Sequence, residues 1–316
     1  MPAYVVVTDS PAGEDLSIEG EVLAGTRVEK ACWSDGADLQ RAVADCDGLL
    51  CMHAPINRAL IQSLGRCRAI VRYGTGLDNI DLPAAADALI PVAGVHNYCT
   101  EEVANHTIAL LLAWNRRLFE YSEMVRSGMW NKRRNTTGNW GYRLERLSGS
   151  TLGLLGFGHI GKAVAVRASA LGMRVLAYSP SLTPGEASRF QVEPVDRTTL
   201  FSRADYLSLH LPLNAETAGT LSSEVIASLK HGCVLINTAR GGLIDEQALV
   251  EALQTGKLGG AILDVYQCAP LPSGHPIREC RNVILTPHMA FYSEGSLNEL
   301  RRRAAEQVRT FLAAGK

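Results

Sequence analysis

One stretch of this chain, from Thr151 to Tyr178, constrains the fold more than any other. It contains the pattern G-x-G-x-x-G as Gly156–Gly161. The pattern alone has low specificity, but it gains weight where a strand precedes it and a helix follows it. The apolar run Thr151–Leu155 predicts that strand, and the pattern of Gly161–Leu171 predicts that helix. We therefore predict a unit of the doubly wound fold that binds dinucleotides.

The three glycines of this turn serve separate physical purposes. Gly156 permits a tight turn, Gly158 lets the backbone approach a pyrophosphate, and Gly161 lets the helix pack close to the strand. Free N–H groups at His159 and Ile160, with the positive end of the helix dipole, would attract the phosphates. The alternative is a glycine turn that binds nothing. In this context we predict that the five residues bind a nicotinamide dinucleotide.

The residue after the next strand bears on which dinucleotide binds. An enzyme that uses NAD usually carries an acid there, which accepts a hydrogen bond from the ribose 2′-hydroxyl. Here the strand Arg174–Tyr178 is followed by Ser179, and the nearest Arg or Lys after Ser179 is Arg189. We place Ser179 at the ribose and expect NAD as the cofactor, while NADP is also possible.

The rest of the chain alternates short apolar runs with helical patterns, as α/β folds do. Three strands are expected in the first hundred residues, and six more between Leu152 and Leu285. A chain of 316 residues is longer than one hydrophobic core usually covers. We therefore predict an α/β protein with two doubly wound parallel sheets, in which a Rossmann coenzyme domain (residues 100–291) is inserted in a flavodoxin-like substrate domain (residues 1–99 plus 292–316).

Two helices at the ends of the inserted domain are expected from their patterns. A long helix is predicted over Thr100–Ser127, and its body is apolar nearly all round, which is typical of a helix buried on several sides. The last helix, Glu294–Ala313, follows the final strand. We expect it to return and pack on the N-terminal domain.

The composition excludes several classes of protein. A formal net charge of −1 provides no electrostatic basis for binding nucleic acid or an anionic membrane. No apolar run approaches the roughly eighteen residues that span a bilayer, and the N-terminus does not resemble a signal peptide. The eight cysteines include no C-x-x-C pair, so a zinc or thioredoxin-like site is not expected, and we predict no metal. We expect reduced thiols in a cytoplasmic protein.

Three further segments carry residues suited to chemistry. In Arg72-Tyr73-Gly74-Thr75-Gly76 a glycine turn follows a strand, and its consecutive N–H groups could hold a carboxylate; an ordinary β-turn is the alternative. Arg240, followed by two glycines, comes directly after the strand Val234–Asn237, where its fork could bind a carboxylate bidentately. His288 follows the strand Val283–Leu285 and could exchange a proton near neutral pH, although a lone histidine is more often structural.

Together these segments resemble the D-isomer-specific 2-hydroxyacid dehydrogenases, and most closely the branch that contains the C-terminal-binding-protein corepressors of animals. The order and spacing of the motifs match that family from about residue 40 to residue 312. The motifs that carry the resemblance are Val71–Asp81, Gly156–Gly161, Asn237–Asp245, Leu263–Val265 and Thr286–Glu294.

The resemblance implies roles for individual residues. His288 would protonate a ketone oxygen as hydride arrives, and Arg240 would bind the carboxylate of a small 2-keto or 2-hydroxy acid. The other substrate-binding residues would be Arg72, Tyr73, Gly74, Thr75, Gly76 and Phe291, with the amides of the glycine turn on the carboxylate. Asp264 would hold the nicotinamide carboxamide. The cofactor cleft would also include His210, Pro212, Thr217, Thr238 and Ala239. The family further implies a homodimer built around the Thr100–Ser127 helix.

The chain departs from the family pattern at Ala269, where a glutamate normally orients the catalytic histidine. Gln267 and Glu294 are the nearest polar substitutes in the sequence, and the loss of a nearby carboxylate should lower the pKa of the histidine. Three interpretations follow. His288 works alone or with Gln267; Ala269 leaves room for a substrate group that partners His288; or catalysis is lost and the protein is a sensor of the dinucleotide.

Overall fold

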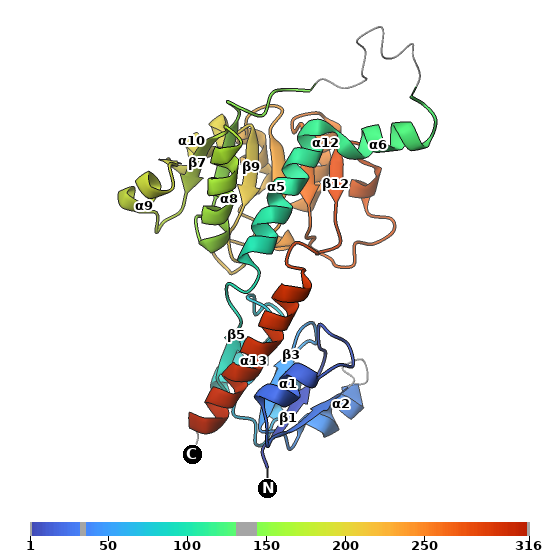
Figure 1. Cartoon of the computed structure of the whole chain (residues 1–316), viewed down its shortest axis with the longest axis vertical. Coiled ribbons are helices and arrows are strands. Elements are labelled where there is room, and N and C mark those ends of the chain that lie inside the picture. The colour runs from blue at the N-terminus through green and yellow to red at the C-terminus, as the bar shows by residue number, and fades with distance from the viewer. Residues whose placement is uncertain (1, 32–35, 131–143, 315–316) are drawn as a thin grey trace. The chain divides into compact units, whose positions relative to one another are not determined.

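The computed structural model describes residues 2–31, 36–130 and 144–314. The chain divides into two compact units, Met1–Cys99 with Tyr292–Lys316, and Thr100–Phe291 (Figure 1). Each unit is an α/β domain with its own parallel sheet, as the alternating sequence pattern predicts. Among the described helices, none has the length and apolar character needed to cross a membrane.

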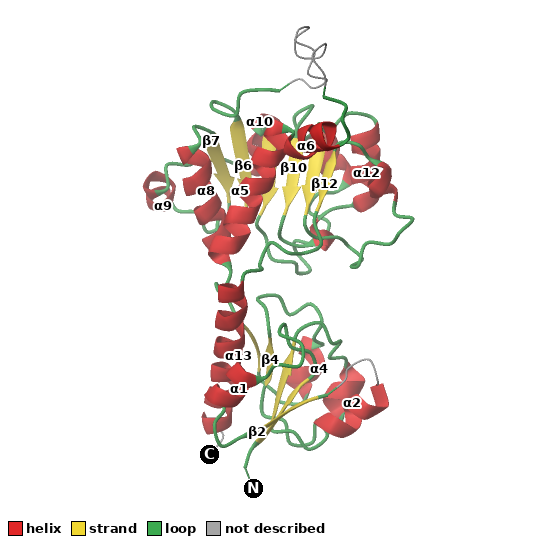
Figure 2. Ribbon diagram, turned by 45° about the vertical axis from the view of Figure 1, so that its right-hand side comes forward, coloured by secondary structure: helices red, strands yellow, loops and turns green. Residues whose placement is uncertain are grey.

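The first unit has a five-stranded parallel sheet in the order β2-β1-β3-β4-β5, which is the flavodoxin-like order. Figure 2 shows strands of this sheet together with helices of the unit. Successive residues of β1 point to opposite faces, so Val5 and Val7 belong to one apolar core and Val6 to the other. The strands are β1 Tyr4–Val7, β2 Arg27–Lys30, β3 Gly48–Cys51, β4 Ile70–Arg72 and β5 Val92–Gly94. The helices are α1 Ser17–Val22, α2 Gly36–Val43, α3 Arg58–Gln62, α4 Leu82–Asp87 and α13 Glu294–Ala314.

The expectation that the last helix packs on the N-terminal domain is confirmed. Buried α13 residues such as Leu300, Ala304 and Val308 share one core with Val5 and Val71 of the sheet. Contact between segments so far apart in sequence closes the first unit around its two ends.

The second unit has a seven-stranded parallel sheet in the order β12-β11-β10-β9-β6-β7-β8. The order reverses between β6 and β9, and doubly wound sheets bind ligands at such a point. The strands are β6 Thr151–Leu155, β7 Arg174–Tyr178, β8 Glu193–Pro194, β9 Tyr206–Leu209, β10 Val234–Asn237, β11 Gly260–Leu263 and β12 Val283–Leu285. The helices are α5 Thr100–Arg116, α6 Leu118–Arg126, α8 His159–Ala170, α9 Pro184–Arg189, α10 Arg197–Arg203, α11 Ser223–Ser228 and α12 Glu246–Gln254, with short 3₁₀ turns at Gly241–Leu243 and Pro276–Glu279.

The predicted long helix from Thr100 to Ser127 is wrong in one respect, because it is two helices. Arg117 has a left-handed backbone (φ +50°), and the chain changes direction there between α5 and α6 (Figure 1). The body of α5 is buried as expected, and its Trp114 lies where a Cβ on Gly260 would be 2.0 Å away. None of the residues of α6 is buried. The apolar periodicity of α6 therefore does not reflect packing within the described chain.

Candidate active site

The register of the second sheet brings the predicted site residues of this unit to one edge. Leu155 of β6 pairs with Leu209 of β9, which pairs with Asn237 of β10; Asn237 pairs with Leu263 of β11, and Leu263 with Leu285 of β12. The strands thus end in line. The residues that follow them, in the order of these pairings, are Gly156, His210, Thr238, Asp264 and Thr286.

The glycine turn has the geometry that a pyrophosphate requires. Gly156 has φ +100°, and a Cβ there would lie 2.5 Å from the carbonyl oxygen of His210. A Cβ on Gly161 would lie 2.6 Å from the carbonyl oxygen of Gly156, so α8 packs directly on the turn. At Gly158, by contrast, a Cβ would meet nothing within 4 Å. The turn therefore presents open space at the N-terminus of α8, which begins at His159 and continues through Ile160.

The end of β7 carries hydroxyl groups in place of the usual acid. The Oγ atoms of Ser179 and Ser181 lie 3.1 Å apart on the surface. The guanidinium of Arg189 lies over the ring of Phe190, 5.4 Å from its centroid, and the ammonium of Lys162 is paired with Glu186 at 2.6 Å. A ribose 2′-hydroxyl and a 2′-phosphate would both meet neutral groups at Ser179.

The turn after β9 supplies neutral polar groups to the same edge. Burial lowers the pKa of His210 to about 4, so its ring is uncharged at neutral pH, and its Nε2 lies 2.9 Å from Ser208 Oγ. Thr217 Oγ1 donates to the carbonyl oxygen of Pro212 (2.6 Å), which closes this turn on itself. The hydroxyl of Thr238, after β10, lies 3.0 Å from that of Thr107 on α5.

The backbone that carries Arg240 is held from two sides. Asn237 Nδ2 donates to the carbonyl oxygen of Arg240 (2.9 Å), and Asn237 Oδ1 accepts from the amide of Ala239 (3.0 Å). A Cβ on Gly241 would lie 1.9 Å from the carbonyl carbon of Tyr266, so only glycine permits this close approach. Arg240 is half-buried, and its Nη1 donates to the carbonyl oxygen of Ala239 (2.8 Å). The loop thus places a cation at the carboxyl edge of the sheet.

A buried carboxylate anchors the loop that carries His288. Asp264 is 0% exposed and accepts from Thr286 Oγ1 (2.6 Å) and from the amides of Met289 (2.9 Å) and Ala290 (2.8 Å). Burial acts to raise the pKa of Asp264, but these hydrogen bonds and one from His106 outweigh it and hold the pKa below its usual value. The anchored loop leaves His288 exposed with a left-handed backbone (φ +56°).

Two features of this loop extend the sequence analysis. The ring of Phe291 meets the ring of His288 edge to face, with centroids 5.9 Å apart, so these two predicted residues do lie together. His106 of α5 was not predicted: its Nε2 lies 3.3 Å from Thr286 Oγ1 and 3.6 Å from Asp264 Oδ1. No local pattern marks His106, because its partners are far away in sequence. The sequence analysis assigned Asp264 to the nicotinamide carboxamide. In the structure its carboxylate anchors the loop that carries His288.

Ala269 is exposed and brings no carboxylate to the loop. The side chain of Gln267, a suggested substitute, donates its Nε2 to the carbonyl oxygen of Ile244 (2.6 Å). The Gln267 amide donates to Glu246 Oε1 (2.7 Å), whose other oxygen lies 3.1 Å from His275 Nε2. Gln267 therefore serves to fasten its own segment to the start of α12. Glu294, the other suggested substitute, begins α13 in the first unit.

The glycine turn of the first unit also has amides that could hold an anion. Arg72 Nε donates to the carbonyl oxygen of Met52 (2.9 Å), and its Nη1 donates to that of Gly76 (2.6 Å). The amide of Gly74 donates to the carbonyl oxygen of Arg72 (2.9 Å), so this amide is used within the turn. Within the described ranges, no backbone or side-chain group accepts from the amides of Thr75 and Gly76. Two of the three predicted amides are thus without an acceptor among the described contacts.

The expectation that Tyr73 is a substrate-binding residue is corrected for its side chain, because that side chain is buried. Tyr73 is 1% exposed, lies in the core with Val71 and Leu300, and donates its hydroxyl to Glu19 (2.9 Å). Side chains alternate between the two faces of the sheet along β4, so the ring that follows Arg72 lies on the opposite face from the Arg72 side chain.

Comparison with known proteins places these features in a family. Residues 108–290, more than half of the chain, match the model described as "D-isomer specific 2-hydroxyacid dehydrogenase, NAD binding domain". A D-3-phosphoglycerate dehydrogenase of Mycobacterium leprae (strain TN) is 35% identical over 89% of this chain and 52% of its own length. The chain thus spans about half the length of that relative. A glyoxylate reductase of Korarchaeum cryptofilum (strain OPF8) is 36% identical over 90% of this chain and 85% of its own length.

Solved structures agree with the sequence comparison. The D-lactate dehydrogenase of Aquifex aeolicus, complexed with NAD and lactic acid, has a TM-score of 0.87 and 27% identity, over 98% of this chain and 96% of that one. An acyclic imino acid reductase in complex with NADPH and D-Arg has a TM-score of 0.85 and 28% identity, over 98% and 97%. Similar proteins are thus known with either dinucleotide, and these relatives do not show a particular likeness to the corepressor branch.

Proposed function

The chain belongs to the D-isomer specific 2-hydroxyacid dehydrogenase family, and on that premise we propose that it interconverts a 2-ketoacid and a D-2-hydroxyacid. One observation carries the proposal: strands that end in register bring the glycine turn at Gly156, Arg240 and the anchored loop of His288 to one edge of a sheet. A dinucleotide turn beside a cation and a histidine suits hydride transfer to a carbonyl that bears a carboxylate.

The dinucleotide would be held by the turn at Gly156–Gly161 and by the neutral groups around Ser179, His210 and Thr238. The open space at Gly158 and the free N-terminus of α8 fit a pyrophosphate. When bound, a nicotinamide dinucleotide supplies or takes up the hydride. Pro212, Thr217 and Ala239 would shape the same cleft. The uncharged groups at Ser179 neither repel a 2′-phosphate nor attract it, so both NAD and NADP belong in the assay.

The reacting carbonyl would be served by two residues of the second unit. Arg240 would bind the substrate carboxylate with its planar fork and stabilise negative charge that develops on the carbonyl oxygen. His288 would donate a proton to that oxygen during reduction and accept it during oxidation. Phe291, against the ring of His288, would restrict the substrate group that fits there. In the first unit, Arg72 and the amides of Thr75 and Gly76 would bind carboxylate oxygens.

The test uses His288→Ala and Arg240→Ala in the full chain. Each should lower ketoacid-dependent oxidation of NADH or NADPH by at least about a thousandfold, while the dissociation constant of the dinucleotide stays the same. The panel tests glyoxylate and other 2-ketoacids in the direction of reduction, and D-lactate and D-3-phosphoglycerate in the direction of oxidation. His231→Ala is the matched control, since His231 is exposed and lies just before β10, at the opposite edge of the sheet. Unchanged turnover in both site variants would contradict the proposal.

A second candidate function rests on Ala269, which replaces the family glutamate. Without that acid, the chain would bind the dinucleotide but reduce ketoacids slowly or not at all. It would then serve as a sensor of NAD(H). The wild-type protein decides between the two functions. Saturable NADH binding without oxidation by any ketoacid of the panel, between pH 5 and pH 8, would favour the sensor.

The apolar surface of α6 supports self-association. Leu118, Phe119 and Val125 are 53%, 55% and 57% exposed, and no residue of this helix is buried. We propose that a second copy of the chain covers this helix, giving a homodimer. Phe119→Asp should shift the mass measured by light scattering from dimer to monomer. Val166→Asp, at a single exposed apolar residue of α8, should leave the mass unchanged. A wild-type monomer would overturn the proposal.

A further inference from the structure

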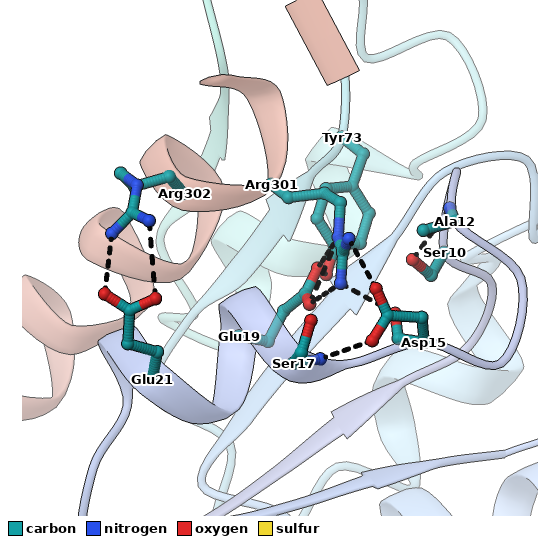
Figure 3. Close-up of polar contacts among 9 residues, drawn as sticks. All are labelled: Ser10, Ala12, Asp15, Ser17, Glu19, Glu21, Tyr73, Arg301 and Arg302. Atoms are coloured by element: carbon teal, nitrogen blue, oxygen red, sulfur yellow. Dashed lines mark hydrogen bonds and ion pairs between the residues drawn. The ribbon is translucent and has the colours of Figure 1, made fainter. Parts of the chain in front are cut away.

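The turn that carries Arg72, Thr75 and Gly76 rests on a buried polar network in the first unit (Figure 3). We call Glu19, Tyr73 and Arg301 the Glu19 network. Glu19 Oε1 accepts from the hydroxyl of Tyr73 (2.9 Å) and from Arg301 Nε (3.0 Å), and Oε2 accepts from Arg301 Nη2 (2.7 Å). Each residue comes from a different element, namely α1, the turn after β4, and α13.

The three side chains of the network are buried and hydrogen-bonded. Glu19, Tyr73 and Arg301 are 0%, 1% and 2% exposed. The remaining guanidinium nitrogen, Arg301 Nη1, reaches Asp15 Oδ2 (3.1 Å). Burial first, and then the charge of Glu19, raise the pKa of Tyr73 well above its usual value, so the phenol remains a donor. A buried ion pair is weak evidence for added stability, and in some proteins such a pair serves to fix one defined arrangement.

A second set of contacts links α13 to the same turn. Gln307 Nε2 donates to the carbonyl oxygen of Gly94 (3.3 Å), at the end of β5. The next residue, Val95, donates its amide to the carbonyl oxygen of Gly74 (2.9 Å) and accepts from Thr75 Oγ1 (3.0 Å). A Cβ on Gly94 would lie 2.6 Å from the carbonyl oxygen of Gly74. The turn is therefore held on one side through Tyr73 and on the other through Val95, and α13 contacts both supports.

We propose that Tyr73, through the Glu19 network, is a positioning residue that sets the direction of the Thr75 and Gly76 amides and thereby the affinity for the substrate carboxylate. This inference rests on the proposed function of the turn. The hydroxyl of Tyr73 is the only polar atom of the turn's side chains that reaches into the network among the described contacts. Its loss would leave the ring packed but free to shift, and the backbone of Gly74 would shift with it.

The kinetic signature separates positioning from a purely structural role. A carboxylate bound alike in the ground state and the transition state contributes to KM and hardly to kcat. A misdirected pair of amides should therefore raise KM. Partial unfolding, by contrast, would remove active molecules, lower the apparent kcat and leave KM unchanged.

The experiment compares Tyr73→Phe with Glu21→Gln in the full chain. Glu21 lies on the same helix as Glu19 and pairs with Arg302 of α13 at 3.3 Å, but that pair is exposed (Figure 3). Tyr73→Phe should raise KM for the ketoacid at least about fivefold, with kcat and the KM for the dinucleotide within about twofold of wild type. Glu21→Gln should change none of these constants. Unchanged KM in Tyr73→Phe, or an equal change in Glu21→Gln, would overturn the inference.

A second measurement does not depend on turnover. The amides of Tyr73 and Val95 are bonded to the carbonyl oxygens of Cys51 (2.7 Å) and Gly74 (2.9 Å), so their hydrogen exchange reports how firmly the turn is held. Both should exchange at least about tenfold faster in Tyr73→Phe and at the wild-type rate in Glu21→Gln. If wild type turns over no ketoacid but exchange accelerates as stated, the proposed function fails and the positioning role stands. If exchange is unchanged in an active enzyme, the positioning role fails alone.

Discussion

Among the residues that the structure describes, each unit buries one carboxylate completely beneath a loop at the carboxyl edge of its parallel sheet, and the two carboxylates are used differently. Asp264 in the second unit accepts directly from two amides and a hydroxyl of the His288 loop. Glu19 in the first unit accepts from the guanidinium of Arg301 and from the phenol of Tyr73. It therefore supports the backbone of the turn through the Tyr73 side chain and not by a direct bond to an amide.

The difference teaches what each anchor is suited to hold. Bonds to the amides of Met289 and Ala290 define the backbone itself, which suits a loop that must keep His288 in a left-handed conformation. The bond to Tyr73 defines a side chain and leaves the amides of Thr75 and Gly76 available to a ligand. We expect loss of Asp264 to affect the chemical step most, and loss of Glu19 to affect stability most.

The largest expected effect is on stability, in Glu19→Gln. The neutral amide leaves the buried guanidinium of Arg301 with Asp15 as its only ionised partner among the described contacts, and breaking a buried pair in this way costs about 3–5 kcal/mol. Urea unfolding followed by a probe in the first unit measures the change. Glu21→Gln, at the exposed pair on the same helix, should change the free energy of unfolding by less than about 1 kcal/mol. Equal losses in the two variants would mean that the network carries no buried charge.

The next effect is on catalysis, in Asp264→Asn. The amide nitrogen of the asparagine would face backbone N–H donors, so the loop must shift, and kcat/KM should fall about a hundredfold. If the anchor is the main role of Asp264, the dissociation constant of NADH is unchanged. A parallel rise in that constant would show instead that the carboxylate holds the carboxamide. Asp205→Asn, at a carboxylate that accepts from Thr151 N at the opposite edge, should leave kcat/KM near wild type.

The pH dependence of stability offers a third test of the same anchor. The pKa of Asp264 is lowered in the folded state, so its contribution is fully present above the unfolded pKa of about 3.9 and is lost as the pH falls through the folded value. The stability advantage of wild type over Asp264→Asn should therefore shrink below about pH 4. The total loss should be about 1.4 kcal/mol for each unit by which folding lowers the pKa of Asp264. Urea unfolding at pH 7 and pH 3 measures it. An advantage that is as large at pH 3 would contradict an ionised anchor.

The smallest expected effect is in Ala269→Glu, which restores the acid of the family. If His288 is the acid–base of the proposed reaction and a carboxylate at position 269 reaches it, its protonated form is favoured. The limb of the kcat/KM profile that falls with rising pH should then move to higher pH, by about one unit. Gln267→Ala is a useful comparison, since the Gln267 side chain already donates to the carbonyl oxygen of Ile244, and its removal should leave the pH profile unchanged. An identical pH profile in Ala269→Glu and wild type would show that the missing acid has been replaced by another group.

Much of the second unit follows from local sequence. Glycines at set intervals after an apolar strand determine the turn at Gly156–Gly161, because each position has its own steric requirement. The strand ends predict that Arg240 and His288 share an edge, since carboxyl ends of parallel strands meet there. The two-residue strand β8 and the change of direction at Arg117 were missed, because neither produces a period that a local pattern can show.

By itself, then, the sequence determined the fold class, the dinucleotide turn and which residue types stand at the carboxyl edges, because these depend on spacing along one strand or turn. Only the tertiary structure decided what supports them. Asp264 and His106 belong to one anchor although they lie on different elements, and Tyr73 turns into a core with Arg301. Glu19 and Arg301 are 282 residues apart, and no local pattern encodes a bond across that separation. The physical reason is that burial and pairing of charge are set by which surfaces meet, and that is decided when the chain closes on itself.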